Sequence, residues 1–183
     1  AGVISQEHAA AIQQIGKGLT LTAIADIDLE RAKAFALEFD VPNVYASSDE
    51  LIDKSDANLI VVATPPAYHE APVIAALEKG RYVLCEKPLA HTLEVARRIC
   101  EVAAKFPKRL VVGHQMRFSH EFQRLKWCAG NAVGELKSAV IERHGHIPAM
   151  HSGSGSWWGK WDVAGGGVLL TQMIHEIDLM IEV

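Results

Sequence analysis

The stretch that decides the fold spans residues 58–88 and reads NLIVVATPPAYHEAPVIAALEKGRYVLCEKP. It contains two nearly continuous apolar runs, Asn58–Thr64 and Tyr82–Cys85, of the kind that form buried strands in a parallel sheet. Between them the sequence predicts a helix over about His69–Lys79, whose first turn tolerates Pro72. The order strand, helix, strand predicts a βαβ unit with a right-handed crossover.

The alternation of strands and helices continues on both sides of this unit. Helices are predicted at Ser5–Ile15 and along the apolar stripes that start at Leu29 and Leu93. Three further runs predict strands, namely Leu19–Ala25, Asn43–Ala46 and Arg109–Gly113. This order predicts an α/β fold with a doubly wound parallel sheet, in which ligands bind in the crevice at the carboxyl ends of the strands.

The composition is that of a soluble enzyme. The 183 residues are 49% hydrophobic and 22% charged, enough to bury a substantial core and to hold one domain plus part of another. With 18 Lys and Arg against 22 Asp and Glu, the net charge of -4 offers no basic field for nucleic acid or an anionic membrane. No apolar run approaches the about 18 residues of a membrane span, and residues 1–5 lack a basic leader, so we expect a cytoplasmic protein.

The sequence gives little sign of a metal site. The three cysteines are odd in number and widely spaced, which fits neither a disulfide framework nor a zinc pattern, so we expect buried free thiols. His144 and His146 would share one side of a strand predicted over Leu136–Ile147. Since no cysteine or carboxylate lies at ligand spacing, we predict no metal; metal binding by this pair is the alternative.

The first residues indicate a nucleotide-binding loop. Gly2 and Ser5 match the second and third positions of a G-x-G-x-x-G fingerprint whose first glycine and feeding strand would precede Ala1, although an ordinary small-residue terminus is an equal alternative. Asp26 ends the next predicted strand, where an acidic residue binds the adenosine ribose. Because a carboxylate there repels a 2′-phosphate, NAD is favoured over NADP unless Arg31 swings in to change the balance.

A charged pair follows the strand Tyr82–Cys85. Glu86 and Lys87 leave that strand just before Pro88, so their side chains are predicted to point into the crevice. A surface ion pair is the alternative interpretation. An exposed lysine is a poor base, but burial and the positive charge of an oxidised nicotinamide both lower a lysine pKa, which makes proton transfer feasible.

Three groups of motifs, in this order, carry a resemblance to a known family. They are Thr64-Pro65-Pro66 with His69, then Cys85-Glu86-Lys87-Pro88-Leu89, then Gly165-Gly166-Gly167 leading to His175. Together they resemble the Gfo/Idh/MocA oxidoreductases. The resemblance implies an NAD(P)-dependent dehydrogenase that acts on CH–OH groups of sugars, inositols or sugar derivatives in carbohydrate metabolism, and a homo-oligomer when full length.

The resemblance also implies two domains. Residues 1–116 would form a Rossmann domain that lacks its first strand, and residues 117–183 would begin the substrate-binding α/β domain. Because members of the family are roughly twice this length on domain-size grounds, we expect the chain to be a fragment.

The same resemblance, together with the strand ends, predicts the site residues. Lys87 and His175 are the predicted catalytic residues. The predicted cofactor-binding residues are Gly2, Ile4, Ser5, Asp26, Thr64, Pro65, His69, Glu86, Lys87 and Gln115. The predicted substrate-binding residues are Lys87, Arg117, Trp157, Trp161, Thr171 and His175. For Arg117, a solvated surface position is an equally good interpretation. For the tryptophans, packing in a core or at a subunit interface is equally plausible.

The last segment is predicted to be one helix in which Thr171, His175 and Asp178 share a face. The family often has aspartate where this chain has Thr171, so a charge that would raise the pKa of His175 is missing. In the predicted mechanism, Lys87 and His175 converge on the substrate hydroxyl, and one of them takes its proton as hydride leaves for NAD. The alternative is a catalytically silent NAD-binding sensor or assembly subunit.

Overall fold

The computed structural model of the chain describes residues 1–142, 144 and 156–183. Its short strands form two parallel sheets that are not hydrogen-bonded to each other within this described part. The strands are β1 (Ala23–Ala25), β2 (Asn43–Tyr45), β3 (Leu59–Val62), β4 (Tyr82–Cys85) and β5 (Leu110–Val112). β1 pairs with β2, and the second sheet has the order β3-β4-β5. The predicted α/β class with parallel strands is confirmed, although most strands are shorter than the apolar runs.

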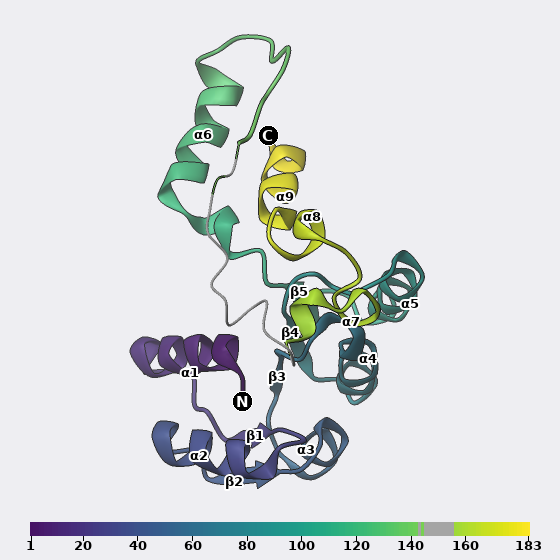
Figure 1. Cartoon of the computed structure of the whole chain (residues 1–183). Coiled ribbons are helices and arrows are strands. Elements are labelled where there is room, and N and C mark those ends of the chain that lie inside the picture. The colour runs from purple at the N-terminus through teal and green to yellow at the C-terminus, as the bar shows by residue number, and fades with distance from the viewer. Residues whose placement is uncertain (143, 145–155) are drawn as a thin grey trace.

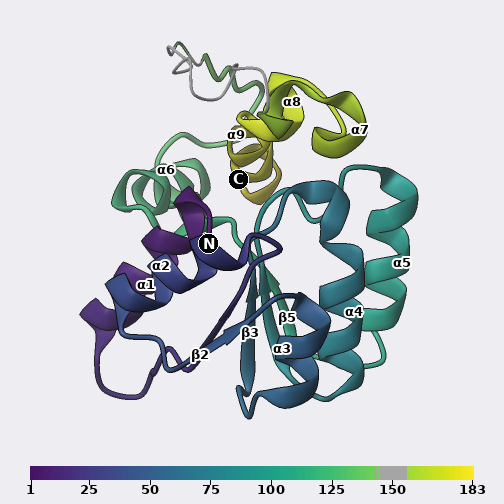
Figure 2. The same cartoon turned by 60° about the horizontal axis from the view of Figure 1, so that its bottom comes forward.

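Helices alternate with the strands along the whole first part of the chain (Figure 1). The α-helices are α1 (Val3–Ile15), α2 (Leu29–Phe39), α3 (Ser48–Lys54), α4 (Glu70–Glu78), α5 (Leu93–Ala103), α6 (His120–Asn131), α7 (Trp161–Ala164), α8 (Val168–Thr171) and α9 (Ile174–Glu182). Short 3-10 helices are η1 (Pro66–Tyr68), η2 (Gln115–Phe118) and η4 (Trp157–Gly159). Figure 2 shows α1 and α2 on one side of the strands and α4 and α5 on the other.

The helix starts follow from the sequence, because hydroxyl and carboxylate side chains satisfy the first free N–H groups of several helices. Asp28, Ser47, Thr92 and Ser119 accept a backbone hydrogen bond at the starts of α2, α3, α5 and α6. α1 begins two residues earlier than predicted and has Gly2 before its first residue.

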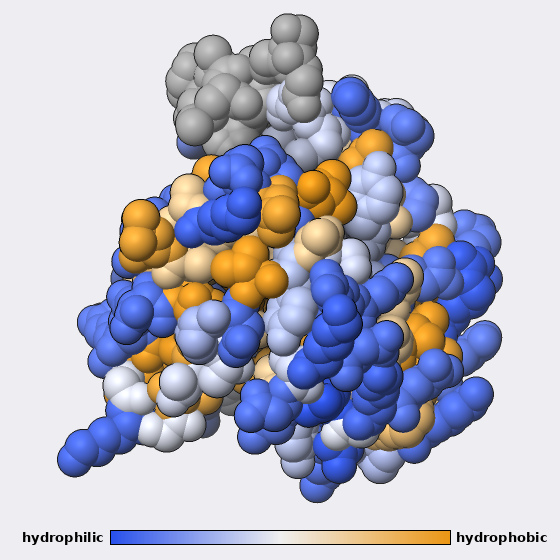
Figure 3. All heavy atoms as spheres, turned by 90° about the horizontal axis from the view of Figure 1, so that it is seen from below, coloured by the Kyte–Doolittle hydropathy of each residue, from blue (hydrophilic) through white to orange (hydrophobic). Residues whose placement is uncertain are grey.

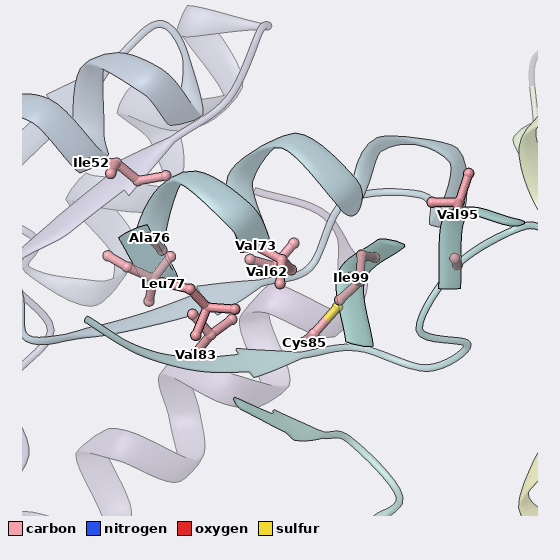
Figure 4. Close-up of a cluster of buried hydrophobic side chains, with 11 residues drawn as sticks. Ile52, Val62, Val73, Ala76, Leu77, Val83, Cys85, Val95 and Ile99 are labelled. Atoms are coloured by element: carbon pink, nitrogen blue, oxygen red, sulfur yellow. The ribbon is translucent and has the colours of Figure 1, made fainter. Parts of the chain in front are cut away.

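The main core lies between the second sheet and helices α4 and α5 (Figure 4). Successive strand residues point to opposite faces, so Val62 and Val83 reach the same side and meet Val73, Leu77 and Ile99 from the helices. Each fully buried aliphatic side chain contributes about 1.5–3 kcal/mol. This core fixes β4, and with it the loop that carries Lys87.

The opposite face of the second sheet is less covered by the described residues of this chain. Tyr82 and Val111 point to this side and remain 51% and 59% exposed. A cavity of about 460 Å³ lies there, lined also by Gly18, Leu19 and Leu59. The apolar runs are nearly continuous in sequence because both faces of the second sheet carry hydrophobic residues. Among the described residues, helices cover only one of these faces. Figure 3 shows hydrophobic residues in several separate patches among hydrophilic ones on the molecular face seen from below.

The last predicted helix is broken. α8 ends at Thr171 and α9 begins at Ile174, so only His175 and Asp178 share a helix. In a continuous helix the carbonyl of Thr171 would accept the N–H of His175. Here that carbonyl accepts a hydrogen bond from Lys87, 3.0 Å away, and the Thr171 hydroxyl bonds the Gly167 carbonyl at 3.1 Å. Both contacts compete with regular helix geometry.

Two further predictions need correction or fall outside the described residues. Residues 136–142 and 144, the described part of the predicted strand Leu136–Ile147, form no strand and pair with none, and His146 lies outside the described residues. All three thiols are free, but only Cys85 is buried, while Cys100 is exposed and Cys128 half-buried. Within the described ranges, no helix is both long and apolar enough to cross a membrane.

The second part of the chain is held together by charges. α6 and α9 lie side by side, away from β1 and β2 (Figures 1 and 2). Glu182 of α9 pairs with Lys126 of α6 and with Arg117 of η2, at 2.9 Å each. The ion pairs therefore fix α9, which carries His175, against the segment that follows β5.

Candidate active site

Lys87 leaves the end of β4 and reaches the second part of the chain. Its Nζ donates to the backbone carbonyl of Thr171 and lies 6.0 Å from the ring centre of Trp158. A carbonyl oxygen and an aromatic face both stabilise a nearby positive charge, so these contacts suit an ammonium group. The Lys87–Pro88 peptide bond is cis. The predicted catalytic lysine thus meets the segment just before His175.

Glu86 is buried beneath this loop, with only 8% of its surface exposed. Its carboxylate lies 2.8 Å from Nε2 of His8 in α1 and accepts the backbone N–H of Lys87 at 3.1 Å. Burial alone would raise the pKa of Glu86, but the hydrogen bonds from His8 and Lys87 outweigh it and lower that pKa. A Cβ at Gly113 would lie only 3.2 Å from this carboxylate. Glu86 therefore ties the Lys87 loop to α1 and packs against Gly113, the residue after β5.

His69 joins the loops that follow β3 and β4. The side chain is completely buried, with Nε2 2.7 Å from the Thr64 carbonyl and Nδ1 3.3 Å from the Leu89 carbonyl. Burial lowers the pKa of His69, although the carbonyl contacts oppose it. Both ring nitrogens of His69 therefore face backbone carbonyls of the protein. The predicted contact with a cofactor would have to come from the His69 backbone, or the side chain would have to move.

His114 turns from the end of β5 toward α9. The backbone N–H of Gly113 continues the sheet by donating to Cys85, and the N–H of His114 then donates to the Val112 carbonyl in a tight three-residue turn. The imidazole meets that of His175 edge to face, with ring centres 6.0 Å apart and planes at 88°. His175 is buried, with 7% of its surface exposed. The structure thus brings two imidazoles and the Lys87 loop into one region.

Arg117 is engaged by acidic residues of α9. Its Nε and Nη2 donate to both carboxylate oxygens of Asp178 at 2.6 and 2.5 Å, and Nη1 lies 2.9 Å from Glu182. The hydrogen bonds from Arg117 lower the pKa of Asp178 below its usual value, and His114 and His175 act in the same direction. Arg117 and Asp178 also line a cavity of about 530 Å³ together with His114. A direct contact of Arg117 with substrate stays a prediction.

The predicted cofactor end lies at the start of α1 and the end of β1. Gly2 lies directly before the first residue of α1, with an extended backbone. Asp26 accepts two hydrogen bonds from Arg31 and one from the backbone N–H of Asp28. Burial opposes its charge, but the hydrogen bonds from Arg31 and from the backbone of Asp28 lower the pKa of Asp26 below its usual value.

These features fit a dinucleotide. The free N–H groups and the positive dipole end of a helix start suit a pyrophosphate. The ionised carboxylate of Asp26 has further lone pairs for ribose hydroxyls. Ser5 lies in the first turn of α1, and Ile4 beside it is partly exposed.

The remaining predicted residues are dispersed. Thr64 and Pro65 lie in the loop after β3, and Gln115 is exposed at the start of η2. Trp157 stacks on Trp158, with ring centres 4.5 Å apart, whereas Trp161 is 73% exposed.

The loop before α8 is fitted closely against the Lys87 loop. Gly165 has a φ of 79°, and a Cβ there would lie 1.9 Å from the His91 carbonyl. Only glycine can occupy this position, because a side chain would clash with backbone and strain the left-handed conformation. The glycine-rich motif therefore holds α7 against the segment that follows Pro88.

Three residues of this region were not predicted from the sequence as site residues: His8, His114 and Trp158. His114 carried a usable signal, because it directly follows a predicted strand, as Glu86 does. Trp158 belongs to the tryptophan cluster from which Trp157 and Trp161 were predicted, whereas His8 carried no signal, since a lone histidine on a helix looks structural. Among the described residues no cluster of metal-binding side chains is found, and His144 is exposed there.

Comparison with known proteins places this geometry in context. A family model described as "Oxidoreductase family, NAD-binding Rossmann fold" (GFO_IDH_MocA) matches residues 1–114. The chain is 39% identical to an inositol 2-dehydrogenase/D-chiro-inositol 3-dehydrogenase of Shouchella clausii, over 98% of this chain and 49% of that protein. It is 36% identical to an inositol 2-dehydrogenase of Agrobacterium fabrum, over 98% of this chain and 51% of that protein. The chain thus spans about half the length of these curated relatives.

A solved structure gives the same picture. The WlbA dehydrogenase from Bordetella pertussis, in complex with NADH and UDP-GlcNAcA, matches with a TM-score of 0.84 and 26% identity. The match covers 98% of this chain and 54% of that one.

Proposed function

Because the chain belongs to the Gfo/Idh/MocA oxidoreductase family with its NAD-binding Rossmann fold, we propose that the whole protein is an NAD-dependent dehydrogenase. It would transfer hydride between nicotinamide and a hydroxyl or carbonyl group of an inositol, sugar or sugar derivative. The observation that carries the proposal is the hydrogen bond from Lys87 Nζ to the Thr171 carbonyl. This bond brings a cationic side chain at the end of a parallel strand next to the helix that holds the buried His175.

The chain's own residues divide the proton chemistry between them. The ammonium of Lys87 donates a hydrogen bond to the substrate oxygen and stabilises the negative charge that develops there during oxidation. His175 accepts the hydroxyl proton. The nicotinamide, when bound, accepts the hydride from the carbinol carbon. Glu86 and His69 hold the Lys87 loop in place through the contacts described above.

The substrate class follows from relatives and from the aromatic pair. The relatives named above include inositol dehydrogenases and a protein crystallised with UDP-GlcNAcA. Trp158 lies beside Lys87 and is extended by the stacked Trp157. An aromatic face of this kind packs against the apolar face of a polyol ring. We therefore propose a cyclic polyol or a sugar as substrate.

The cofactor is proposed to be NAD rather than NADP. The ionised Asp26 favours ribose hydroxyls and repels a 2′-phosphate, but Arg31 on the same carboxylate reduces this repulsion. NADP would then be a weaker second cofactor. A cytoplasmic location and a homo-oligomeric whole protein remain predictions from the sequence and the family resemblance.

The test is a substrate panel with the whole protein. Inositols, free sugars and UDP-linked sugars are each mixed with NAD or NADP, and the absorbance of the reduced nicotinamide is followed. We expect turnover within one of these classes, faster with NAD. Calorimetry with NADH is the parallel measurement. NADH binding without turnover in any class would instead identify a silent NAD-binding subunit, and absence of NADH binding would contradict both functions.

A further inference from the structure

His114 lies where the two parts of the site meet. It follows β5 in the first part of the chain, and its ring faces His175 of α9 in the second part. Its Nδ1 is buried and lies 3.6 Å from Oδ2 of Asp178, slightly beyond hydrogen-bond length, with no other partner among the described residues. Catalytic hydrogen bonds are often this long before ligands bind and shorten in the complex.

The charged groups around His114 come from three elements. Asp178 of α9 favours its protonated form, whereas Arg117 of η2 and Lys87 of the loop after β4 disfavour it. Glu86, also in that loop, acts like Asp178. Burial has the largest effect, so the pKa of His114 lies below that of a free histidine. At neutral pH the ring is therefore uncharged and able to accept a proton.

The contact between the two imidazoles gives a route for that proton. Arg117 already occupies Asp178 with two hydrogen bonds, which fixes the carboxylate beside Nδ1 of His114. A donor Nδ1–H directed at Asp178 leaves the other ring nitrogen as an acceptor. The ring centres of His114 and His175 lie 6.0 Å apart, so the two imidazoles are direct neighbours. One water molecule between their ring nitrogens would complete a route for the proton.

We propose that His114 is a positioning residue that acts through His175, accepting from it the proton that the substrate hydroxyl releases. The inference rests on the proposed dehydrogenase function and deepens it. On oxidation the carbinol C–H bond breaks with its electron pair, which leaves as hydride to the bound NAD. The O–H bond breaks as the carbonyl forms, and its proton goes to His175. His114 then takes this proton transiently, while Asp178 offsets part of the cost of a buried imidazolium. The proton leaves to solvent through the cavity that His114 lines, so both rings are neutral for the next turnover.

The kinetic test compares three variants of the whole protein. His114→Phe keeps an aromatic ring but cannot carry a proton, and His114→Ala leaves space for free imidazole. His120→Ala removes an exposed histidine at the start of α6 and is the matched control. We expect both His114 variants to lose about a hundredfold in kcat with little change in NADH affinity. Added imidazole should raise the kcat of His114→Ala by about tenfold or more, because it replaces one proton-transfer group. It should leave the kcat of His114→Phe unchanged.

Other results overturn the inference. If His114→Phe kept the wild-type kcat, the ring of His114 would serve for packing only. A His114→Ala variant that imidazole does not rescue would exclude proton transfer.

A second measurement needs no turnover and separates this inference from the proposed function. Nitrogen NMR of the imidazole rings reports which ring nitrogen carries the proton. Our inference requires the neutral His114 ring to be protonated at Nδ1, toward Asp178; protonation at Nε2 would refute it even if the enzyme were active. Conversely, an Nδ1–H ring in a protein that turns over no polyol would contradict the proposed function while leaving the His114–Asp178 pair in place.

Discussion

An acidic and a basic residue follow the end of β1 and the end of β4, but the structure uses the two pairs differently. At β1, Arg31 caps Asp26 with two hydrogen bonds, and half of the arginine side chain is in solvent. At β4, buried Glu86 bonds to His8 and to a backbone N–H, while the ammonium of Lys87 reaches Thr171. The Asp26–Arg31 pair is closed on itself, whereas the Glu86–Lys87 pair is split so that the lysine is directed elsewhere. The two carboxylate side chains are about equally buried, with 9% and 10% of their surface exposed, so the pairs differ in where the basic side chain points and not in burial.

The largest effect is expected at the β4 end. Lys87→Met removes the ammonium while keeping an unbranched apolar chain, so kcat should fall by about a hundredfold to ten-thousandfold. NADH affinity should stay within a few-fold, because the nucleotide is proposed to bind mainly near α1 and β1. Steady-state kinetics and calorimetry on the whole protein measure both quantities. Lys33→Met, at an exposed ion pair of α2, is the control and should leave kcat unchanged. A variant at Lys87 that kept most of its kcat would remove this residue from the chemistry.

A smaller effect is expected from Glu86→Ala. The change removes the acceptor of a buried backbone N–H and of His8, which costs about 1–3 kcal/mol of unfolding free energy. Glu30→Ala is the matched control, because its exposed pair with Lys33 is worth at most about 1 kcal/mol. Urea unfolding measures both. Equal losses for the two variants would mean that Glu86 is not the buried anchor of the Lys87 loop.

The pH dependence of stability tests the same buried region. Burial lowers the folded-state pKa of His69 below the 6.5 of an unperturbed histidine. The unfolded chain therefore binds more protons as the pH falls through 6.5, and stability decreases toward lower pH by up to about 1.4 kcal/mol per pH unit. Carboxylates with lowered pKa values lose their contribution only at more acidic pH. Urea midpoints should fall between pH 7 and 5, with a smaller slope for His69→Gln; an unchanged slope in that variant would argue against a buried neutral ring.

The smallest effect is expected at the β1 end. Asp26→Ala frees Arg31 and removes the repulsion of a 2′-phosphate, so the ratio of kcat/KM for NAD over NADP should fall by roughly tenfold. Asp28→Ala is the control, since it removes only the cap of α2 and should lower stability without altering the ratio. A ratio that Asp26→Ala leaves unchanged would exclude this carboxylate from the cofactor site.

The sequence was informative where local patterns decide the structure. The alternation of strands and helices along the chain and the cap at Asp28 follow from apolar periodicity and side-chain chemistry within a few residues. Lys87 stood out because an amine at a strand end has few structural uses. The family resemblance drew attention to His175, which lies close to the Lys87 contact.

Long-range contacts account for what the sequence did not reveal. The break between α8 and α9 accompanies a hydrogen bond between residues 84 positions apart, which no periodicity can report. The orientation of His114 depends on the turn at Gly113, and the proximity of Trp158 to Lys87 depends on the path of the chain before α7. The less covered face of the second sheet resembles a buried one in sequence, because both carry apolar residues.

In the proposed site, the ammonium of Lys87 and the imidazole of His175 both contact a single substrate oxygen. A crystal structure of the whole protein with NADH and a polyol that it turns over measures this directly. We predict that Nζ of Lys87 and a ring nitrogen of His175 both lie within about 3.2 Å of the oxygen on the reacting carbon. A complex in which Nζ points to bulk solvent, or in which the reacting carbon binds away from both side chains, would contradict the account.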